Sequence, residues 1–343
     1  MRMSTFFAAT LACLLLVASV ACGGAAEEPT AVPSSADDLS GERIEGTNES
    51  LAADPGEATE IAFTVNDTGV QGPDSVPAGW VRLNFQNSGN SDQHLALVQL
   101  TGGKTGDDLK AFIEQDPKAP LPDWALPSGG PGDTAPGVTA VLTQNLREGS
   151  YVWVNYVLGD DEIARAGPDV MRQFTVTAST EPGVAPTADI IITMFDYDFS
   201  LQDTRGRFDN FDGGSGIDPG PRIIKFSNDS KLVHEARLAL IDGGKQARDF
   251  PDVYTMKPRG KPARLGIEAP AAPSPVFDDD GKGPGGPPPS TAIGGVMALR
   301  PGQSAYMTID LAKGWYFIYD MLEDTEIQAP YLFRPTAREF GVR

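Results

Sequence analysis

The stretch "AGWVRLNFQNSGNSDQHLALVQLTGGK", residues 78–104, decides the fold because it occurs twice. Its second copy is "GPRIIKFSNDSKLVHEARLALIDGGK", residues 220–245. In each copy a run of alternating apolar residues ends in Phe-x-Asn, and a short polar turn follows. A histidine then opens a second run, which Gly-Gly-Lys closes. Alternation with a period of two is typical of β-strands. The chain is therefore predicted to repeat one pair of strands in two halves.

A second repeated segment lies near the end of each half. "TQNLREGSYVWVNYV", residues 143–157, and "TIDLAKGWYFIYDML", residues 308–322, share Thr, Leu, Gly and Tyr at the same spacing. The Leu-x-x-Gly-x-Tyr spacing predicts a tyrosine corner, in which Tyr151 or Tyr316 bonds back to the backbone of a Greek-key turn. We therefore predict an all-β protein of two tandem Greek-key β-sandwich domains.

The predicted domains follow from this repeat. The first covers residues 55–178 and the second residues 188–343, with a Pro/Gly-containing linker at 179–187. A Pro/Gly-rich insertion, residues 257–290, lengthens the second half. Residues 106–115 are predicted to form a small helix because their apolar side chains fall on one stripe.

The N-terminus is predicted to be an export signal. Residues 1–21 begin with a charged residue and continue with an apolar stretch too short to span a membrane comfortably. The "SVACGG" that follows resembles a bacterial lipoprotein box, which implies lipidation of Cys22 and attachment to the outer face of the cytoplasmic membrane. Ser19 and Ala21 also fit an ordinary signal peptidase site, and the protein would then be secreted.

Composition bounds the remaining possibilities. Residues 22–54 are rich in Ala, Pro, Ser and acids, so we expect a disordered acidic tether. The net charge of −20 excludes the basic footprint of a nucleic-acid-binding protein. Both cysteines, Cys13 and Cys22, fall within the first 22 residues, and the predicted domains therefore contain neither a disulfide nor a thiolate.

At these motifs the chain resembles a tandem of cupredoxin-like domains, the family of the blue copper proteins. In that family the strand-opening histidine is the first copper ligand, a cysteine lies on the later Gly-x-Tyr strand, and a histidine and a methionine follow it. The corresponding positions in this chain are His94, Asn155, Asp160 and Met171 in the first half, and His234 and Asp320 in the second.

The resemblance implies a copper site that these residues cannot complete. Type 1 copper needs a thiolate and two imidazoles, and the thiolate position holds Asn155 or Asp320. We therefore predict no cofactor and no metal. His94 and His234 are expected to be structural, at inward-facing strand positions and hydrogen-bonded to a loop backbone.

These observations favour a lipid-anchored bacterial cell-envelope protein that is not an enzyme. Its two cupredoxin-like modules would have a binding or structural role, with the membrane, an envelope protein or a small molecule as partner. The alternative is a copper-binding or electron-transfer protein of the cupredoxin type. A third possibility is an enzyme that acts on envelope glycans through exposed carboxylates.

Overall fold

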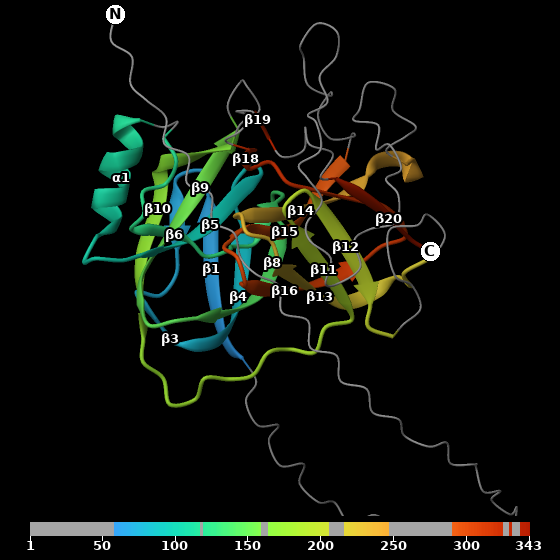
Figure 1. Ribbon diagram of the computed structural model, residues 1–343, viewed down its shortest axis with the longest axis horizontal. Coiled ribbons are helices and arrows are strands. Elements are labelled where there is room, and N and C mark those ends of the chain that lie inside the picture. The colour runs from blue at the N-terminus through green and yellow to red at the C-terminus, as the bar shows by residue number, and fades with distance from the viewer. Residues whose placement is uncertain are drawn as a thin grey trace, which may run out of the picture. The chain divides into compact units, whose positions relative to one another are not determined.

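The computed structural model describes residues 58–116, 119–158, 164–205, 216–246, 290–324, 329–330 and 337–343, and strands dominate it (Figure 1). Ala52–Arg343 forms one compact unit. Several predictions fall outside the described residues, namely the signal peptide 1–21, Cys22, the tether 22–54, Asp160 and all but the last residue of the insertion 257–290. Among the described residues, no helix is long and apolar enough to cross a membrane.

The described residues of the first half form ten strands and one helix. The strands are β1 (Thr59–Asn66), β2 (Gly69–Gln71), β3 (Ser75–Pro77), β4 (Gly79–Asn87), β5 (Gln93–Leu100), β6 (Ala125–Pro127), β7 (Gly132–Thr134), β8 (Thr139–Leu146), β9 (Gly149–Leu158) and β10 (Ala164–Thr177). The helix α1 (Gly106–Gln115) has the predicted bounds. Thr105 and Asp108 form a capping box at its start, and Leu109 and Ile113 are its buried side chains.

The described part of the second half also consists mainly of strands. Its strands are β11 (Ile190–Phe195), β12 (Asp198–Asp203), β13 (Gly220–Asn228), β14 (His234–Ile241), β15 (Ser290–Leu299), β16 (Ser304–Leu311), β17 (Gly314–Tyr319), β18 (Glu323–Asp324), β19 (Ala329–Pro330) and β20 (Arg338–Val342). A 3₁₀ turn, η1 (Asp242–Gly244), follows β14.

The two halves share the same strand pairing. β1 runs parallel to β4, which pairs antiparallel with β8, and β11, β13 and β16 repeat this pattern. The facing sheets are built around β5–β9–β10 in the first half and β14–β17–β20 in the second. Each half has its own apolar core between its sheets. The prediction of an all-β fold of packed sheets is confirmed, whereas the predicted domain boundaries stay a prediction.

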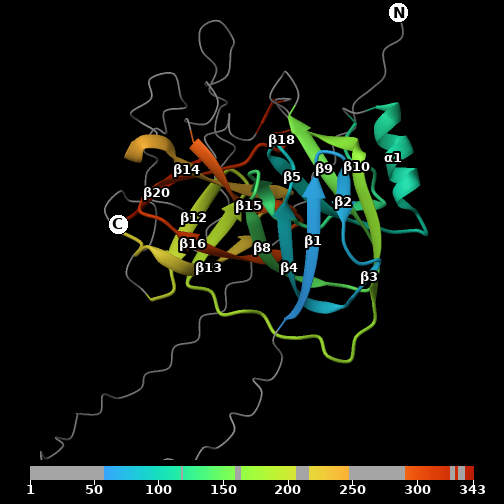
Figure 2. The same cartoon turned by 180° about the vertical axis from the view of Figure 1, so that it is seen from behind.

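The halves are joined through one continuous sheet. β8 pairs antiparallel with β16, and the eight-stranded sheet runs in the order β12-β11-β13-β16-β8-β4-β1-β2 (Figure 2). Leu142 faces Met307 in this pairing, and these residues lie nine positions before the two repeated tyrosines. The strand pair is therefore symmetric about a local two-fold axis through the repeat. Leu142 also packs into the core of the second half.

Backbone hydrogen bonds also join the halves near two Gly-Gly pairs, which are Gly129–Gly130 in the first half and Gly294–Gly295 in the second. The amide of Gly129 donates to the Ala298 carbonyl at 2.9 Å, and the amide of Met297 donates to the Gly130 carbonyl at 3.1 Å. Gly295 has a φ of +122°, and a Cβ placed there would lie 2.1 Å from the Ala236 carbonyl oxygen. Only glycine allows this close approach of backbones.

Tyr316 and the predicted linker each make a backbone contact that bears on the predictions. The Tyr316 hydroxyl donates to the Ala312 carbonyl at 2.8 Å, as a tyrosine corner requires. The predicted linker, residues 179–187, contains no strand, and its Pro182 carbonyl accepts from the Trp80 amide at 2.6 Å. The linker is thus attached to the first half by its backbone.

The prediction that the side of β5 that carries His94 faces the core is wrong. Leu95 and Leu97 point into the core between the sheets, while Val98 and Leu100 pack under α1. Both faces of this strand are covered, so the alternation of "HLALVQL" gives no unique inner face. On β14 the prediction holds for Ala236 and Leu238, which lie in the core of the second half.

Candidate functional site

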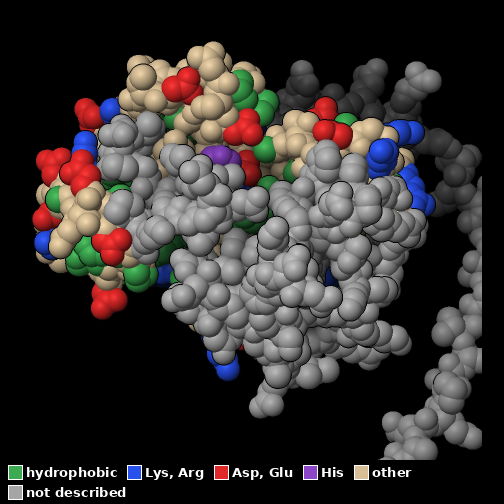
Figure 3. All heavy atoms as spheres, turned by 90° about the horizontal axis from the view of Figure 1, so that it is seen from above, with side chains coloured by type: hydrophobic (Ala, Val, Ile, Leu, Met, Phe, Trp, Pro, Cys, Tyr) green, Lys and Arg blue, Asp and Glu red, His purple; other side chains and the backbone are tan. Residues whose placement is uncertain are grey.

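His94 opens β5 and forms a pair with a carboxylate that the sequence analysis did not select. Its Nδ1 lies 2.5 Å from Asp133 Oδ1, on the neighbouring strand β7. Its backbone amide donates to Asn155 Oδ1 at 3.0 Å. The His94 side chain keeps 14% of its surface exposed. One face of the molecule shows histidine at the surface with acidic side chains beside it (Figure 3).

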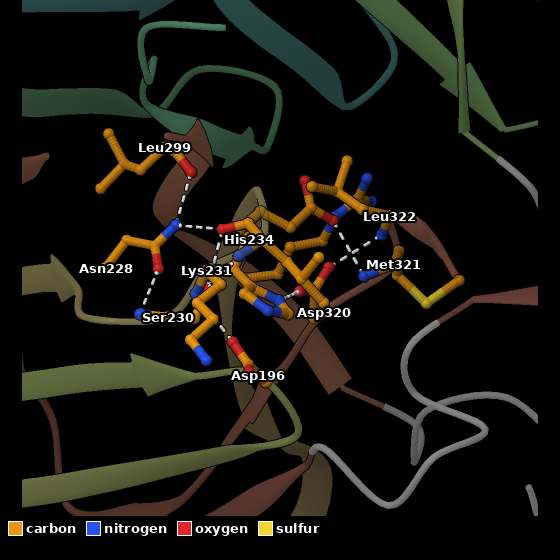
Figure 4. A network of polar contacts seen from close by, with 12 residues as sticks. Asp196, Asn228, Ser230, Lys231, His234, Leu299, Asp320, Met321 and Leu322 are labelled. Carbon is orange, nitrogen blue, oxygen red and sulfur yellow. Dashed lines mark hydrogen bonds and ion pairs between the residues drawn. The ribbon is translucent and has the colours of Figure 1, made fainter. Parts of the chain in front are cut away.

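His234 opens β14 and forms the corresponding pair in the second half. Its Nδ1 lies 2.7 Å from Asp320 Oδ2, and Asp320 Oδ1 accepts from the Leu322 amide at 2.8 Å (Figure 4). Both side chains are at most 2% exposed. This histidine therefore belongs to the interior, unlike His94.

The repeated Phe-x-Asn motif explains why each histidine lies where it does. Asn87 Nδ2 donates to the carbonyls of Ser91 and Thr134 at 2.9 and 2.7 Å. Asn228 makes the same two bonds, to Leu232 and Leu299, at 2.8 and 2.7 Å. Each asparagine thus ties the turn before the histidine to a neighbouring strand, which places the imidazole at the strand start.

The two histidines are not in the same register. His94 lies five positions before Gln99, which faces Tyr151, whereas His234 lies six positions before Leu240, which faces Tyr316. The strand β14 therefore has one residue more than β5 between its histidine and the tyrosine register. Glu235 lies five positions before Leu240 and therefore takes the register position that His94 has on β5.

A buried chain of charges connects the halves. Arg237 Nη1 lies 3.4 Å from Asp133 Oδ1, and Arg237 Nε donates to Glu235 Oε1 at 2.6 Å. Glu235 Oε1 also accepts from the Met321 amide at 3.0 Å, and the Tyr319 hydroxyl lies 3.5 Å from Asp133 Oδ2. Arg237 and Glu235 are at most 1% exposed. The second half thus supplies the cation that the first half's Asp133 needs.

The pKa values of these groups follow from burial and charge. Burial by itself would raise the pKa of Asp133, but the Arg237 cation and the hydrogen bond from His94 outweigh it and hold that pKa below its usual value. An ionised carboxylate only accepts hydrogen bonds, so His94 donates from Nδ1. Burial raises the pKa of Glu235 to about 7. The charges of Asp320 and Asp133 add to the rise, and the Arg237 cation opposes it only in part.

The structure brings together some of the predicted site residues. Asn155 lies beside His94 and Asp320 beside His234, whereas Met171 packs with the apolar side chains under α1. Their assignment as counterparts of copper ligands stays a prediction. At Nδ1 each imidazole contacts a carboxylate rather than the loop backbone that was expected as its partner.

Sequence reasoning missed Asp133, Glu235, Arg237 and Tyr319. A signal was present in "HEARLALI", where a glutamate and an arginine alternate inside an otherwise apolar strand start. Charged side chains two apart on a strand share a face, and such residues are fully buried only when paired. Nothing in the sequence around Asp133 indicates a buried charge, because "PGDT" has the composition of an ordinary turn.

The two pairs do not fit a metal ion as they stand. Ligands about 2.0 Å from a tetrahedral metal lie roughly 3.3 Å from each other. The paired nitrogen and oxygen atoms here are 2.5 and 2.7 Å apart, which is hydrogen-bond distance. The described residues also contain no group of three His, Cys, Asp or Glu side chains arranged to hold a metal.

The fold is all-β, and each half is built from facing sheets. No family model and no curated protein matches the chain. Auracyanin A, a blue copper protein from Chloroflexus aurantiacus, is similar over 35% of this chain and all of its own, at 16% identity and a TM-score of 0.25. Copper nitrite reductase from Nitrosomonas europaea is similar over 84% of this chain and 94% of its own, at 12% identity and a TM-score of 0.20. The McoA multicopper oxidase from Aquifex aeolicus is similar over 83% of this chain and 66% of its own, at 10% identity and a TM-score of 0.24.

The prediction that the chain is not an enzyme is contradicted by these similarities. The similar structures include a multicopper oxidase and a copper nitrite reductase, both of them enzymes. A likeness at 10–12% identity assigns no activity to this chain.

Proposed function

We propose that the protein is a lipid-anchored binding protein of the bacterial cell envelope, in which His–carboxylate pairs replace type 1 copper. The observation that carries the proposal is the direct bond from each histidine to a carboxylate, His94 to Asp133 and His234 to Asp320. Each imidazole uses Nδ1 for that bond. A ligand entering either pair would first have to break a charge-assisted hydrogen bond.

Of the two histidines, His94 is the one that a partner can reach. Its side chain is partly exposed, and its Nδ1 donates to Asp133, so Nε2 is the ring atom left to contact a ligand. Asp133 fixes the ring orientation, much as second-shell carboxylates do for histidine ligands. The pole of the first half around His94 is therefore our proposed contact surface for an envelope protein or small molecule.

Copper loading tests the missing metal site. After the full chain is incubated with Cu(II) and exchanged into metal-free buffer, we expect well under one copper per protein and no intense blue absorption. The variants H94A and H234A should retain the same small amount. Elemental analysis provides the measurement. Stoichiometric copper that is lost in either variant would instead support the copper-binding or electron-transfer alternative.

Replacement of Cys22 tests the proposed anchor. In cells that express C22A, we expect the protein to move from the membrane fraction to the soluble extracytoplasmic fraction or to remain uncleaved, because the acyl chains have no attachment site. Fractionation and mass determination of the mature N-terminus measure this. C13A is the matched control and should leave the fractionation unchanged. A wild-type chain that begins elsewhere and carries no lipid would refute the anchor.

A further inference from the structure

The junction between the halves holds more acidic groups than fixed cations. The carboxyl groups of Asp133, Glu235 and Asp320 are buried there, and among the described residues the permanent cation in contact with them is Arg237. Burying an excess negative charge costs far more than burying a neutral group. The cluster therefore favours the uptake of at least one proton in addition to the protons within its two histidine–carboxylate hydrogen bonds.

One atom of the cluster is arranged to take that proton. Glu235 Oε1 accepts two hydrogen bonds, from Arg237 Nε and from the Met321 amide. Glu235 Oε2 is buried and has no hydrogen-bond partner in the part of the chain that the structure describes. A buried carboxylate oxygen without a donor is costly, and a proton on that oxygen removes the charge at the atom that lacks compensation.

We propose that the junction is a proton-binding site in which the proton resides on Glu235 Oε2, and that its occupancy controls how firmly the two halves hold each other. The groups that face Glu235 are Arg237 on its own strand, Asp133 on β7, Tyr319 on β17 and Asp320 just after β17. The imidazoles hydrogen-bond to two of these carboxylates. This inference does not depend on the proposed binding function.

The link between the proton and the junction is Arg237. With Glu235 neutral, the guanidinium compensates Asp133 of the first half, whereas an ionised Glu235 competes with Asp133 for the same cation. The raised pKa of Glu235, about 7 in the closed junction against a usual 4.5, supports this geometry. When the junction opens to water, Glu235 releases its proton more readily, and the open state therefore gains as the pH rises from about 4.5 to about 7. Above that window the dependence on Glu235 levels off.

Infrared spectroscopy of the unmodified full chain tests where the proton is. Exposed carboxyl groups are ionised at about pH 6, so a protonated-carboxyl band that persists there in the folded protein must come from a buried acid. We expect such a band at about pH 6 and its loss at about pH 9. The E235Q variant should lack the band, and E148Q, which changes an exposed glutamate, should keep it. Absence of the band from the wild-type protein at about pH 6 would overturn the proposal.

Hydrogen exchange tests the coupling to the junction. The amides of Gly129 and Met297 bond across the halves and report its opening directly. After correction for intrinsic exchange rates, we expect their protection in the wild-type protein to fall by up to about tenfold per pH unit between pH 5 and pH 7. Glutamine reproduces the neutral acid, so the E235Q variant should fold and show protection with a flat pH dependence. E148Q should follow the wild type. Equal pH dependence in wild type and E235Q would refute the coupling.

Discussion

The variant R237A is expected to lose about 3–5 kcal/mol of unfolding free energy, because it leaves Asp133 and Glu235 buried without their cation. The guanidinium is 1% exposed and bonds to a carboxylate of each half, so water cannot take its place without opening the junction. Urea unfolding monitored by tryptophan fluorescence measures the loss. A change below about 1 kcal/mol would show that the cluster tolerates its missing charge.

Two further variants separate charge from packing at this position. In R82A a partly exposed ion pair with Glu60 is removed, and we expect a loss of under about 1 kcal/mol. The triple variant R237M, D133N and E235Q removes the guanidinium and the two carboxyl groups that it contacts, at similar volume, and leaves Asp320 bonded to His234. It should recover much of the stability lost in R237A, because buried ion pairs can often be replaced by uncharged groups of matching shape.

The variant G295A is expected to be as damaging, at about 3 kcal/mol or more, for a steric reason. The added Cβ would lie 2.1 Å from the Ala236 carbonyl oxygen and 3.0 Å from the Arg237 Cα, and neither backbone can move without shifting β14. The equivalent G130A would place its Cβ 2.2 Å from the Leu95 carbonyl oxygen in the first half. Both losses can be measured by thermal unfolding.

Gly302 provides the matched control for this steric argument. Its φ is +76°, and a Cβ placed there would have no heavy atom within 4 Å. The G302A variant should therefore lose only the unfolding free energy that a left-handed backbone costs an alanine, about 1–2 kcal/mol. If G295A and G302A lose the same amount, the close approach of the strands at Gly295 has no energetic consequence.

The sequence predicted the all-β fold and the helix over residues 106–115 because both depend on local periodicity. The resemblance to cupredoxin-like domains implied that Asn155 lies near His94 and Asp320 near His234, and the structure brings these residues together. The sequence could not identify the partner of His94, since Asp133 lies on a three-residue strand that has no counterpart signal in the repeat. It could not show that Arg237 reaches into the other half either, because that contact depends on how the halves meet.

The inner face of β5 was mispredicted for a related reason. The pattern beginning at His94 is apolar on nearly every residue, and α1 covers the side of the sheet opposite the core. A strand buried on both faces carries no information about which face is inner. The helix that covers it was itself predicted correctly, but its position on the sheet was not.

The shared sheet has a consequence for the edges of each half. β8 and β16 lie inside the eight-stranded sheet only because each is paired with the other. A half expressed alone would present one of these strands as an open edge, with a row of unpaired N–H and C=O groups that can recruit another chain. Each half therefore protects the other from self-association, and the tandem arrangement is a means of solubility as well as of architecture.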